Sequence, residues 1–231
     1  MKIELKNVSK SYKKNLILKD VNIKFEDGKI YGFVGRNGSG KTVLLKLICG
    51  YIKPTTGCVC YDEKILNKDI DIPPSTRCLI ENPQFLPYKT GYQNLKLLAD
   101  ILNLIDKKEI NDTLKKVNLY EEKDKLYHNY SLGMKQKLGI AQVLMENPHI
   151  IILDEAFNGI EEETAKKLRN VLIEEKNKGK IIILASHIKE DIDVLVDVLY
   201  KVDNNKIEQV KWSTLNQQNV DFFLVYHNFI Y

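Results

Sequence analysis

Residues 35 to 42 read Gly35-Arg36-Asn37-Gly38-Ser39-Gly40-Lys41-Thr42. This run fits the pattern G-x-x-x-x-G-K-S/T, whose glycines let the backbone curl and point its N–H groups inward around phosphates. In that pattern Lys41 reaches the β- and γ-phosphates, and the hydroxyl of Thr42 is a ligand for Mg²⁺. The run therefore predicts a site for a nucleoside triphosphate with magnesium.

The segments on either side of this loop supply the context that the pattern requires. Lys29–Val34 is short and apolar, as expected of a strand. Val43–Cys49 is an apolar run that suits a helix, and Gly50 is placed to end it. A helix that starts at Thr42 adds its positive N-terminal end to the phosphate site. A chance glycine-rich turn is a poor explanation for this order of strand, loop and helix.

Two acidic residues follow a second apolar strand. His149–Leu153 reads as a strand buried on both faces of a parallel sheet, and Asp154 and Glu155 come directly after it. Ligands of open α/β sheets bind at this edge. We expect Asp154 to hold Mg²⁺, directly or through water. We expect Glu155 to act as general base on the attacking water, because a carboxylate tied to a metal is a poor base.

Strand and helix patterns alternate along the rest of the chain. Further strands are expected at Lys2–Asn7, Val21–Phe25 and Lys180–Ala185, and a hairpin at Val198–Val202 with Ile207–Lys211.

Helices are expected at Tyr92–Val117, with an interruption near Asn103–Asp106, at Ser131–Met145 and at Glu161–Lys176. This order predicts an α/β fold with a mostly parallel sheet and a helical insertion.

The composition is typical of a globular protein. Of 231 residues, 44% are hydrophobic and 29% are charged, and the net charge of +4 is too small for a dedicated nucleic-acid binder. The most apolar runs, Ile150–Leu153 and Ile181–Ala185, are far shorter than the roughly 20 residues of a membrane-spanning helix. The four cysteines form no C-x-x-C pair, so a zinc site is not expected. We expect a cytoplasmic protein with reduced thiols.

The most specific signal is the run Tyr130-Ser131-Leu132-Gly133-Met134-Lys135-Gln136-Lys137. It looks like the signature of the ABC ATPase family, usually L-S-G-G-Q, and Ser131 stands 154 − 131 = 23 positions before Asp154. The chain resembles that family over about residues 1–210. Ser131 suits the N-cap of a helix. The resemblance implies that this helix start, with Gly133, contacts the γ-phosphate of ATP bound to another subunit.

Other elements of the family follow in order. Tyr12 is placed like the aromatic residue that stacks on adenine, and His187 like the switch histidine that contacts the γ-phosphate. Glu81 stands where the family usually has the glutamine that senses Mg²⁺ and the permease, and Gln84 is the alternative equivalent. We hypothesise that Glu81 adds a negative charge near the metal and strengthens Mg²⁺ binding.

Several positions depart from the pattern of the family. Leu132 and Met134 replace a glycine and a glutamine of the signature, Ala156 replaces a proline, and Glu161 replaces an aspartate. The S-L-G-M-K-Q form resembles subunits of peptide and bacteriocin exporters and immunity systems. The longer side chain of Glu161 puts the family's contacts across the dimer in doubt.

The resemblance implies an α/β fold with a P-loop NTPase core and an N-terminal antiparallel β subdomain. It implies an ATPase domain over residues 1–211, with its helical subdomain at about 88–146, and residues 212–231 are expected to pack on this domain as a tail. The chain would bind and hydrolyse ATP with Mg²⁺ and power a separate membrane permease, as an exporter of a peptide or hydrophobic compound. It would form a homodimer, or a heterodimer with a second ATPase chain, at the inner face of the membrane.

Two other functions remain as alternatives. The first is a non-transport ABC protein acting on DNA or the ribosome. Such proteins usually carry coiled coils, zinc modules or two ATPase halves, and the sequence shows no sign of these. The second is a regulator that binds ATP without hydrolysing it. Lys41, Glu155 and His187 argue against it, although Met134 and Glu161 leave it open.

Overall fold

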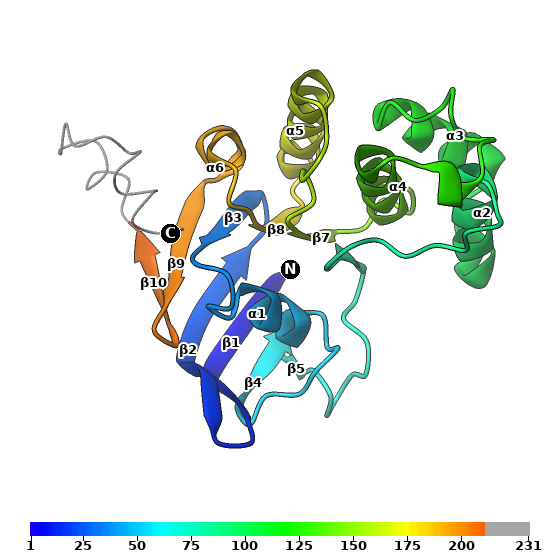
Figure 1. Cartoon of the computed structure of the whole chain (residues 1–231). Helices are drawn as coiled ribbons and strands as arrows, with labels where there is room; N and C mark the ends of the chain where they lie inside the picture. The colour runs from blue at the N-terminus through cyan, green and yellow to red at the C-terminus, as the bar shows by residue number, and fades with distance from the viewer. Residues whose placement is uncertain (211–231) are drawn as a thin grey trace.

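The computed structural model describes residues 1–210 and contains two sheets with helices between and around them (Figure 1). The elements in chain order are β1 (Lys2–Tyr12), β2 (Asn15–Glu26), β3 (Lys29–Val34), α1 (Lys41–Ile48), β4 (Thr56–Tyr61), β5 (Lys64–Ile65), β6 (Thr76–Leu79), α2 (Gly91–Leu102), α3 (Lys107–Lys116), a 3₁₀ turn (Tyr127–Asn129), α4 (Leu132–Leu144), β7 (Ile150–Asp154), α5 (Glu162–Asn177), β8 (Ile181–Ala185), α6 (Lys189–Leu195), β9 (Val198–Asp203) and β10 (Lys206–Val210).

The larger sheet has six strands in the order β10-β9-β3-β8-β7-β6. All of its pairs are parallel except β10 with β9, which form the predicted hairpin. Asn204 and Asn205 make the turn of this hairpin with positive φ angles of 47° and 65°, as a two-residue hairpin turn requires. The expected α/β fold with a mostly parallel sheet is confirmed.

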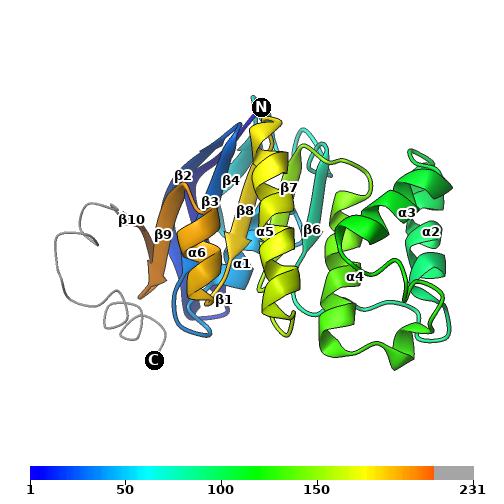
Figure 2. The same ribbon diagram turned by 90° about the horizontal axis from the view of Figure 1, so that it is seen from above.

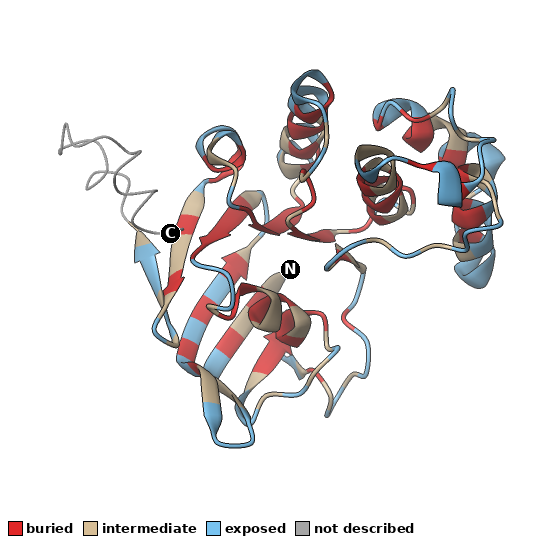
Figure 3. Cartoon of the chain, viewed as in Figure 1, coloured by how far each residue is buried: buried red, intermediate tan, exposed pale blue. Residues whose placement is uncertain are grey.

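Helices cover both faces of this sheet, which explains its continuous apolar strands. Ile150 and Ile152 of β7 pack in the cluster that contains α1, whereas Ile151 and Leu153 pack in the cluster that contains α5. All four side chains are almost completely buried. Figure 2 shows α5 and α6 along the outer face, and Figure 3 shows β7 and β8 as buried throughout.

The smaller sheet is antiparallel, in the order β2-β1-β4-β5, and encloses α1 against the larger sheet. Strands β1 and β2 are longer than the predicted Lys2–Asn7 and Val21–Phe25. Their register shifts at several points, and Asn7 and Asp20 have positive φ angles of 50° and 47°. These irregularities break the alternation of apolar residues, so the sequence pattern stops before the strands do.

Helices α2, α3 and α4 stand together beside β6 (Figure 2). The break predicted near Asn103–Asp106 is confirmed: α2 ends at Leu102, and Asp106 caps α3 through a capping box with Glu109.

Strands β4, β5 and β6 were not predicted from the sequence. β6, for example, is a four-residue edge strand in which only Leu79 is buried, so it has no continuous apolar run. The predicted packing of residues 212–231 falls outside the described part of the chain. Between residues 1 and 210, no helix combines the length and the apolar character that crossing a bilayer requires.

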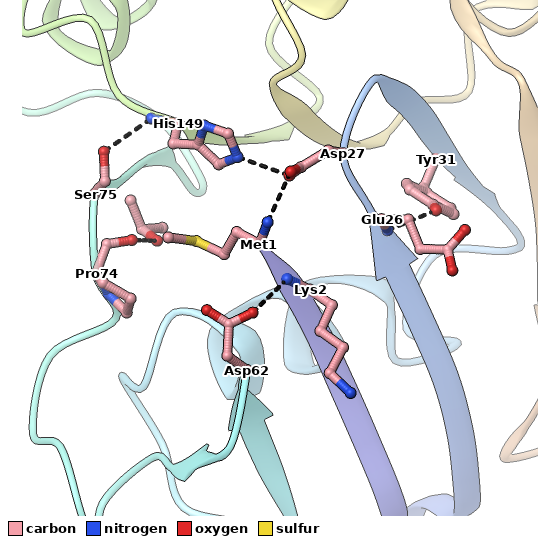
Figure 4. A network of polar contacts seen from close by, with 10 residues as sticks. Met1, Lys2, Glu26, Asp27, Tyr31, Asp62, Pro74, Ser75 and His149 are labelled. Carbon is pink, nitrogen blue, oxygen red and sulfur yellow. Dashed lines mark hydrogen bonds and ion pairs between the residues drawn. The ribbon is translucent and has the colours of Figure 1, made fainter.

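Polar contacts join the two sheets at the end opposite the phosphate loop (Figure 4). His149, before β7, has its Nε2 atom 2.7 Å from Oδ1 of Asp27, in the turn between β2 and β3. Its backbone N–H donates to Oγ of Ser75, 2.9 Å away, just before β6. These contacts fix the start of β7, whose other end carries Asp154.

Candidate nucleotide-binding site

The loop between β3 and α1 forms the floor of a cavity of about 410 Å³. Gly40, which caps α1, has a φ angle of 111° that only glycine adopts without strain. Helix α1 begins at Lys41, one residue before the predicted start. Residues from the loop, the β6–α2 connection and the end of β7 line the cavity, among them Asn37, Lys41, Thr42, Glu81, Asp154 and Glu155.

Lys41 is held over the loop that precedes it. Its ammonium donates to the carbonyl oxygen of Gly35 at 2.6 Å and to that of Arg36 at 3.3 Å, and the residue is 7% exposed. Burial lowers the pKa of Lys41, while the charges of Glu155 and Asp154 oppose this shift. Lys41 therefore lines the cavity together with acidic side chains whose charges it feels.

Thr42 and Asp154 are joined as their predicted roles require. The hydroxyl of Thr42 donates to Oδ2 of Asp154 at 2.7 Å, which connects the start of α1 to the end of β7. Burial raises the pKa of Asp154, whereas the hydrogen bond from Thr42 and the charge of Lys41 lower it. A hydroxyl beside a buried carboxylate is a set of hard oxygen ligands that suits Mg²⁺.

Glu155 contacts His187 at the edge of the cavity. Oε2 of Glu155 lies 2.6 Å from Nδ1 of His187 and accepts from its backbone N–H at 3.4 Å. Glu155 adopts a left-handed backbone with φ 50°, and its N–H donates to the carbonyl oxygen of Ala185 at 2.9 Å. This conformation turns the Glu155 carboxylate away from the strand direction and toward the loop that follows β8.

A network of hydrogen bonds and ion pairs around Asp191 supports the loop that carries His187. Ser186 donates from Oγ to Oδ2 of Asp191 at 2.6 Å, and Arg169 donates from Nε to Oδ1 of Asp191 at 2.8 Å. Arg169 also contacts Glu162, at the start of α5, at 2.6 Å. The network therefore links the start of α5 with the residue that precedes His187.

Glu81 lines the cavity, but its carboxylate is paired. Oε1 of Glu81 is 2.5 Å from Nζ of Lys46 on α1, and the backbone of Glu81 is left-handed with φ 63°. The charge of Glu81 still reaches Asp154, whose pKa it raises. Gln84, the alternative equivalent, is exposed and does not line the cavity.

Some predicted nucleotide ligands lie outside the cavity of their own chain. Tyr12 ends β1, is 48% exposed and has Nζ of Lys10 4.9 Å from its ring centre. Ser131 caps α4 by accepting from the N–H of Met134 at 3.3 Å, which is the predicted N-cap, and Gly133 faces the carbonyl of Gly159. The lining of the cavity does not include these three residues. It also does not include four other predicted residues, Gly35, Arg36, Ser39 and His187.

The site also contains residues to which the sequence assigned no role. Ile17, Asn82 and Gln136 line the cavity. Gln136 belongs to the quoted signature run, but no local pattern indicates that it lines the same cavity as the phosphate loop of its own chain. In the phosphate loop itself, although not in the lining of the cavity, the buried Oγ of Ser39 has no hydrogen-bond partner among the residues that the structure describes, which fits a loop that awaits phosphate.

Comparison with known proteins identifies relatives among the ATP-binding proteins of ABC transporters. The model of a protein family described as ABC transporter matches residues 18–158. The uncharacterized ABC transporter ATP-binding protein YybJ of Bacillus subtilis (strain 168) is 40% identical over 206 residues, which cover 89% of this chain and 94% of that protein.

Two further relatives have transport functions in their names. The bacitracin transport ATP-binding protein BcrA of Enterococcus faecalis is 34% identical over 220 residues, covering 94% of this chain and 71% of that protein. The lantibiotic transport ATP-binding protein SrtF of Streptococcus pyogenes is 32% identical over 206 residues, covering 89% and 88%.

Solved structures share the fold. An ATP-binding subunit of an ABC transporter superimposes with a TM-score of 0.83 at 24% identity, covering 94% of this chain and 93% of that one. A dimeric ATP-binding cassette in a post-hydrolysis state, bound to ADP and Pi, has a TM-score of 0.79 at 23% identity, covering 90% and 99%.

Proposed function

The chain belongs to the ABC transporter family, and from this premise we propose that it is the ATP-binding and ATP-hydrolysing subunit of an exporter whose permease is a separate membrane protein. The observation that carries the proposal is the joint placement of Lys41, Thr42, Asp154 and Glu155 around one cavity, with His187 in contact with Glu155. These are the kinds of group that one chain supplies for phosphoryl transfer to water.

Each residue has a task that its surroundings support. Lys41 exchanges the carbonyls of Gly35 and Arg36 for phosphate oxygens when ATP binds. Thr42 and Asp154 would hold Mg²⁺, which neutralises charge on the phosphates when bound. Glu155 accepts a proton from the attacking water.

His187 contributes by fixing the Glu155 carboxylate. Its ring Nδ1 and its backbone N–H both meet Oε2, which leaves Oε1 free of these two contacts and able to take the proton. The Asp191 network below Ser186 holds the loop in this position.

The signature residues support a working dimer. Ser131 and Gly133 lie outside the cavity of their own chain, at the start of α4. The N-terminus of a helix favours bound anions. We infer that they contact the γ-phosphate held by a partner ATPase, either a second copy or a related chain.

An exposed apolar region on the helical part is suited to the permease. Ile101, Leu102 and Leu104 are 73%, 51% and 64% exposed, and the first two line a groove of about 160 Å³ beside Arg77 of β6. Exposed apolar groups in one region mark interaction surfaces. Since β6 leads into the Glu81 connection, a permease in this groove would sense the nucleotide site and would hold the ATPase on the inner face of the membrane.

The names of the relatives support a peptide-like cargo. The names of BcrA and SrtF refer to bacitracin and lantibiotic transport. The S-L-G-M-K-Q form of the signature in this chain resembles that of peptide and bacteriocin exporters. We propose that the permease partner exports a peptide antibiotic or a similar hydrophobic compound.

The substitution Glu155→Gln tests the proposal. It removes the general base and keeps the shape of the side chain, so the turnover number falls by about a hundredfold to ten-thousandfold while ATP still binds. Size-exclusion chromatography with Mg²⁺ and ATP then shows an accumulated dimer. The control is Glu163→Gln, which removes a carboxylate that is 84% exposed on α5.

One outcome would count against this mechanism, and a second would show what closure of the dimer requires. Hydrolysis at the wild-type rate by Glu155→Gln would show that Glu155 is not the base. A variant that stays monomeric with ATP would show that closure needs the permease or a different second ATPase chain.

A further inference from the structure

Gln136 is buried in the wall of the nucleotide cavity, and the oxygen of its carboxamide has no hydrogen-bond partner among the described residues. The residue is 3% exposed and lines the cavity together with Glu81 and Asp154. Within residues 1–210, its Oε1 atom has no hydrogen-bond donor. A buried acceptor of this kind destabilises the structure unless something supplies a donor.

The packing of α4 explains why Gln136 faces the cavity. Gly139 lies three residues later on the same side of the helix. A Cβ atom on Gly139 would lie 2.9 Å from Cδ1 of Leu79 and 3.0 Å from Cβ of Pro83, so α4 packs closely on these two residues at Gly139. Leu79 and Pro83 flank Glu81, so this side of α4 rests on the connection that lines the cavity.

The chemistry of the cavity restricts what can donate to Oε1 of Gln136. The neighbouring Glu81, Asp154 and Glu155 carry carboxylates, which only accept hydrogen bonds when ionised, and so do the oxygens of an ionised triphosphate. The donors that line the same cavity, Lys41 and Thr42 among them, make no hydrogen bond to Oε1. We therefore take a water molecule that enters with the ligand as the donor. Mg²⁺ dehydrates reluctantly and keeps several waters when it binds phosphates.

We propose that Gln136 is a binding residue for the magnesium-bound nucleotide of its own chain, and that its Oε1 accepts a hydrogen bond from a water molecule that enters with the metal ion. The proposal rests on the proposed ATPase function and extends it. It gives α4 two contacts: Ser131 begins the helix and faces the partner, whereas Gln136 faces the chain's own nucleotide. Metal-bound nucleotide in one chain thereby sets the position of the helix that closes on the other.

The test measures binding of a fluorescent ATP analogue to the full chain, once with Mg²⁺ and once with EDTA. Gln136→Met keeps the length of the side chain but removes the acceptor. It should weaken binding with Mg²⁺ by about threefold to tenfold, the usual net effect of one hydrogen bond, and leave binding in EDTA unchanged. The matched control is Gln142→Met, the same substitution on the same helix at a half-buried residue outside the cavity.

A second variant tests the role of Gln136 even if Gln136→Met does not fold. Gln136→Glu keeps an acceptor at this position and adds negative charge, so it should weaken binding in EDTA and raise the ratio of the EDTA dissociation constant to the Mg²⁺ dissociation constant. A ratio that falls, or a Gln136→Met variant that binds as Gln142→Met does, overturns the role of Gln136. Failure of the unsubstituted chain to bind the analogue in both buffers would instead overturn the proposed function.

Discussion

At the scale of single residues, the acidic side chains at the end of β7 are each held by one partner: Asp154 by Thr42, and Glu155 by His187. Lys41, Thr42 and Asp154 meet as their motifs require. The contact between Glu155 and His187 depends on β7 and β8 being neighbours, which no local pattern encodes. The proposed role of Gln136 could not be predicted from the sequence, because it depends on how α4 packs on the connection around Glu81.

The charge of Glu81 has a consequence for the pH dependence of hydrolysis. Asp154 must be ionised to hold a cation, and Glu81 raises its pKa beyond the effect of burial. An acid with a raised pKa ionises at higher pH. Glu81→Gln therefore lowers the pKa of Asp154, and the acid limb of kcat/KM moves to lower pH. A pH profile of the ATPase activity measures this shift.

The same variant tests whether Glu81 strengthens magnesium binding. If it does, Glu81→Gln needs more Mg²⁺ for half-maximal hydrolysis, and an unchanged requirement would show that the ion pair with Lys46 cancels its effect. Glu163→Gln is the control for both measurements, since it neutralises an exposed acid on α5.

The ionic network below His187 makes a prediction about stability. Arg169→Met leaves Asp191, which is 0% exposed, without its cationic partner, and the free energy of unfolding should fall by about 3–5 kcal/mol. Burial already raises the pKa of Asp191, and loss of Arg169 raises it further. The deficit is therefore present above the folded-state pKa and shrinks as the pH falls through it. Urea unfolding at several pH values measures the effect.

A matched control separates buried from exposed ion pairs. Lys167→Met removes the partner of Glu163 on the same helix, where both side chains are exposed, and should cost less than about 1 kcal/mol. Equal losses in the two variants would mean that the Arg169 network is not a special support.

At the scale of elements, the sequence predicted helices better than strands. The starts of α2, α3 and α4 follow from their capping residues, Thr90, Asp106 and Ser131. The predicted first strand ends too early because the alternation of apolar and polar residues along β1 breaks at Asn7. β6 was missed because an edge strand needs no continuous apolar run. A repeat of two residues identifies a regular strand, and a repeat of 3.6 residues identifies a regular helix. The positions of bulges and edge strands depend instead on how the neighbouring strands pair.

The caps of α4 and α2 allow structure and function to be separated. Ser131 and Thr90 both cap a helix through the side-chain oxygen, so Ser131→Ala and Thr90→Ala should each reduce stability by about 1 kcal/mol. Only Ser131→Ala should also reduce ATP hydrolysis, because only α4 is proposed to face the partner's nucleotide. Thermal unfolding and ATPase rates compare them, and an equal loss of activity would contradict the role of Ser131.

At the scale of the whole molecule, the fold class follows from the alternation of elements, but the position of the start of α4 relative to the nucleotide cavity does not. The parallel sheet brings the phosphate loop and the Asp154–Glu155 edge together. The same arrangement leaves the start of α4 outside that cavity, so one chain holds only part of the proposed catalytic site.

Mixing two defective variants tests whether two copies of this chain complete the site. Lys41→Ala removes a phosphate ligand from its own cavity, and Ser131→Ala removes one from the partner's. Each alone should be inactive or nearly so. A mixed dimer contains one intact pair, so mixing should restore ATP hydrolysis. No recovery would indicate that the natural partner is a different ATPase chain.

The position of β3 in the larger sheet affects how the chain is made. β3 is completed by residue 34, yet its neighbours on both sides are β8 and β9, which end at residues 185 and 203. During synthesis the ribosome therefore releases an apolar central strand long before either of its edges can be covered. Unpaired strands of this kind are prone to aggregation. The nascent chain must therefore be protected from aggregation for most of its translation. A messenger RNA truncated before β9 yields a product in which one edge of β3 is unpaired.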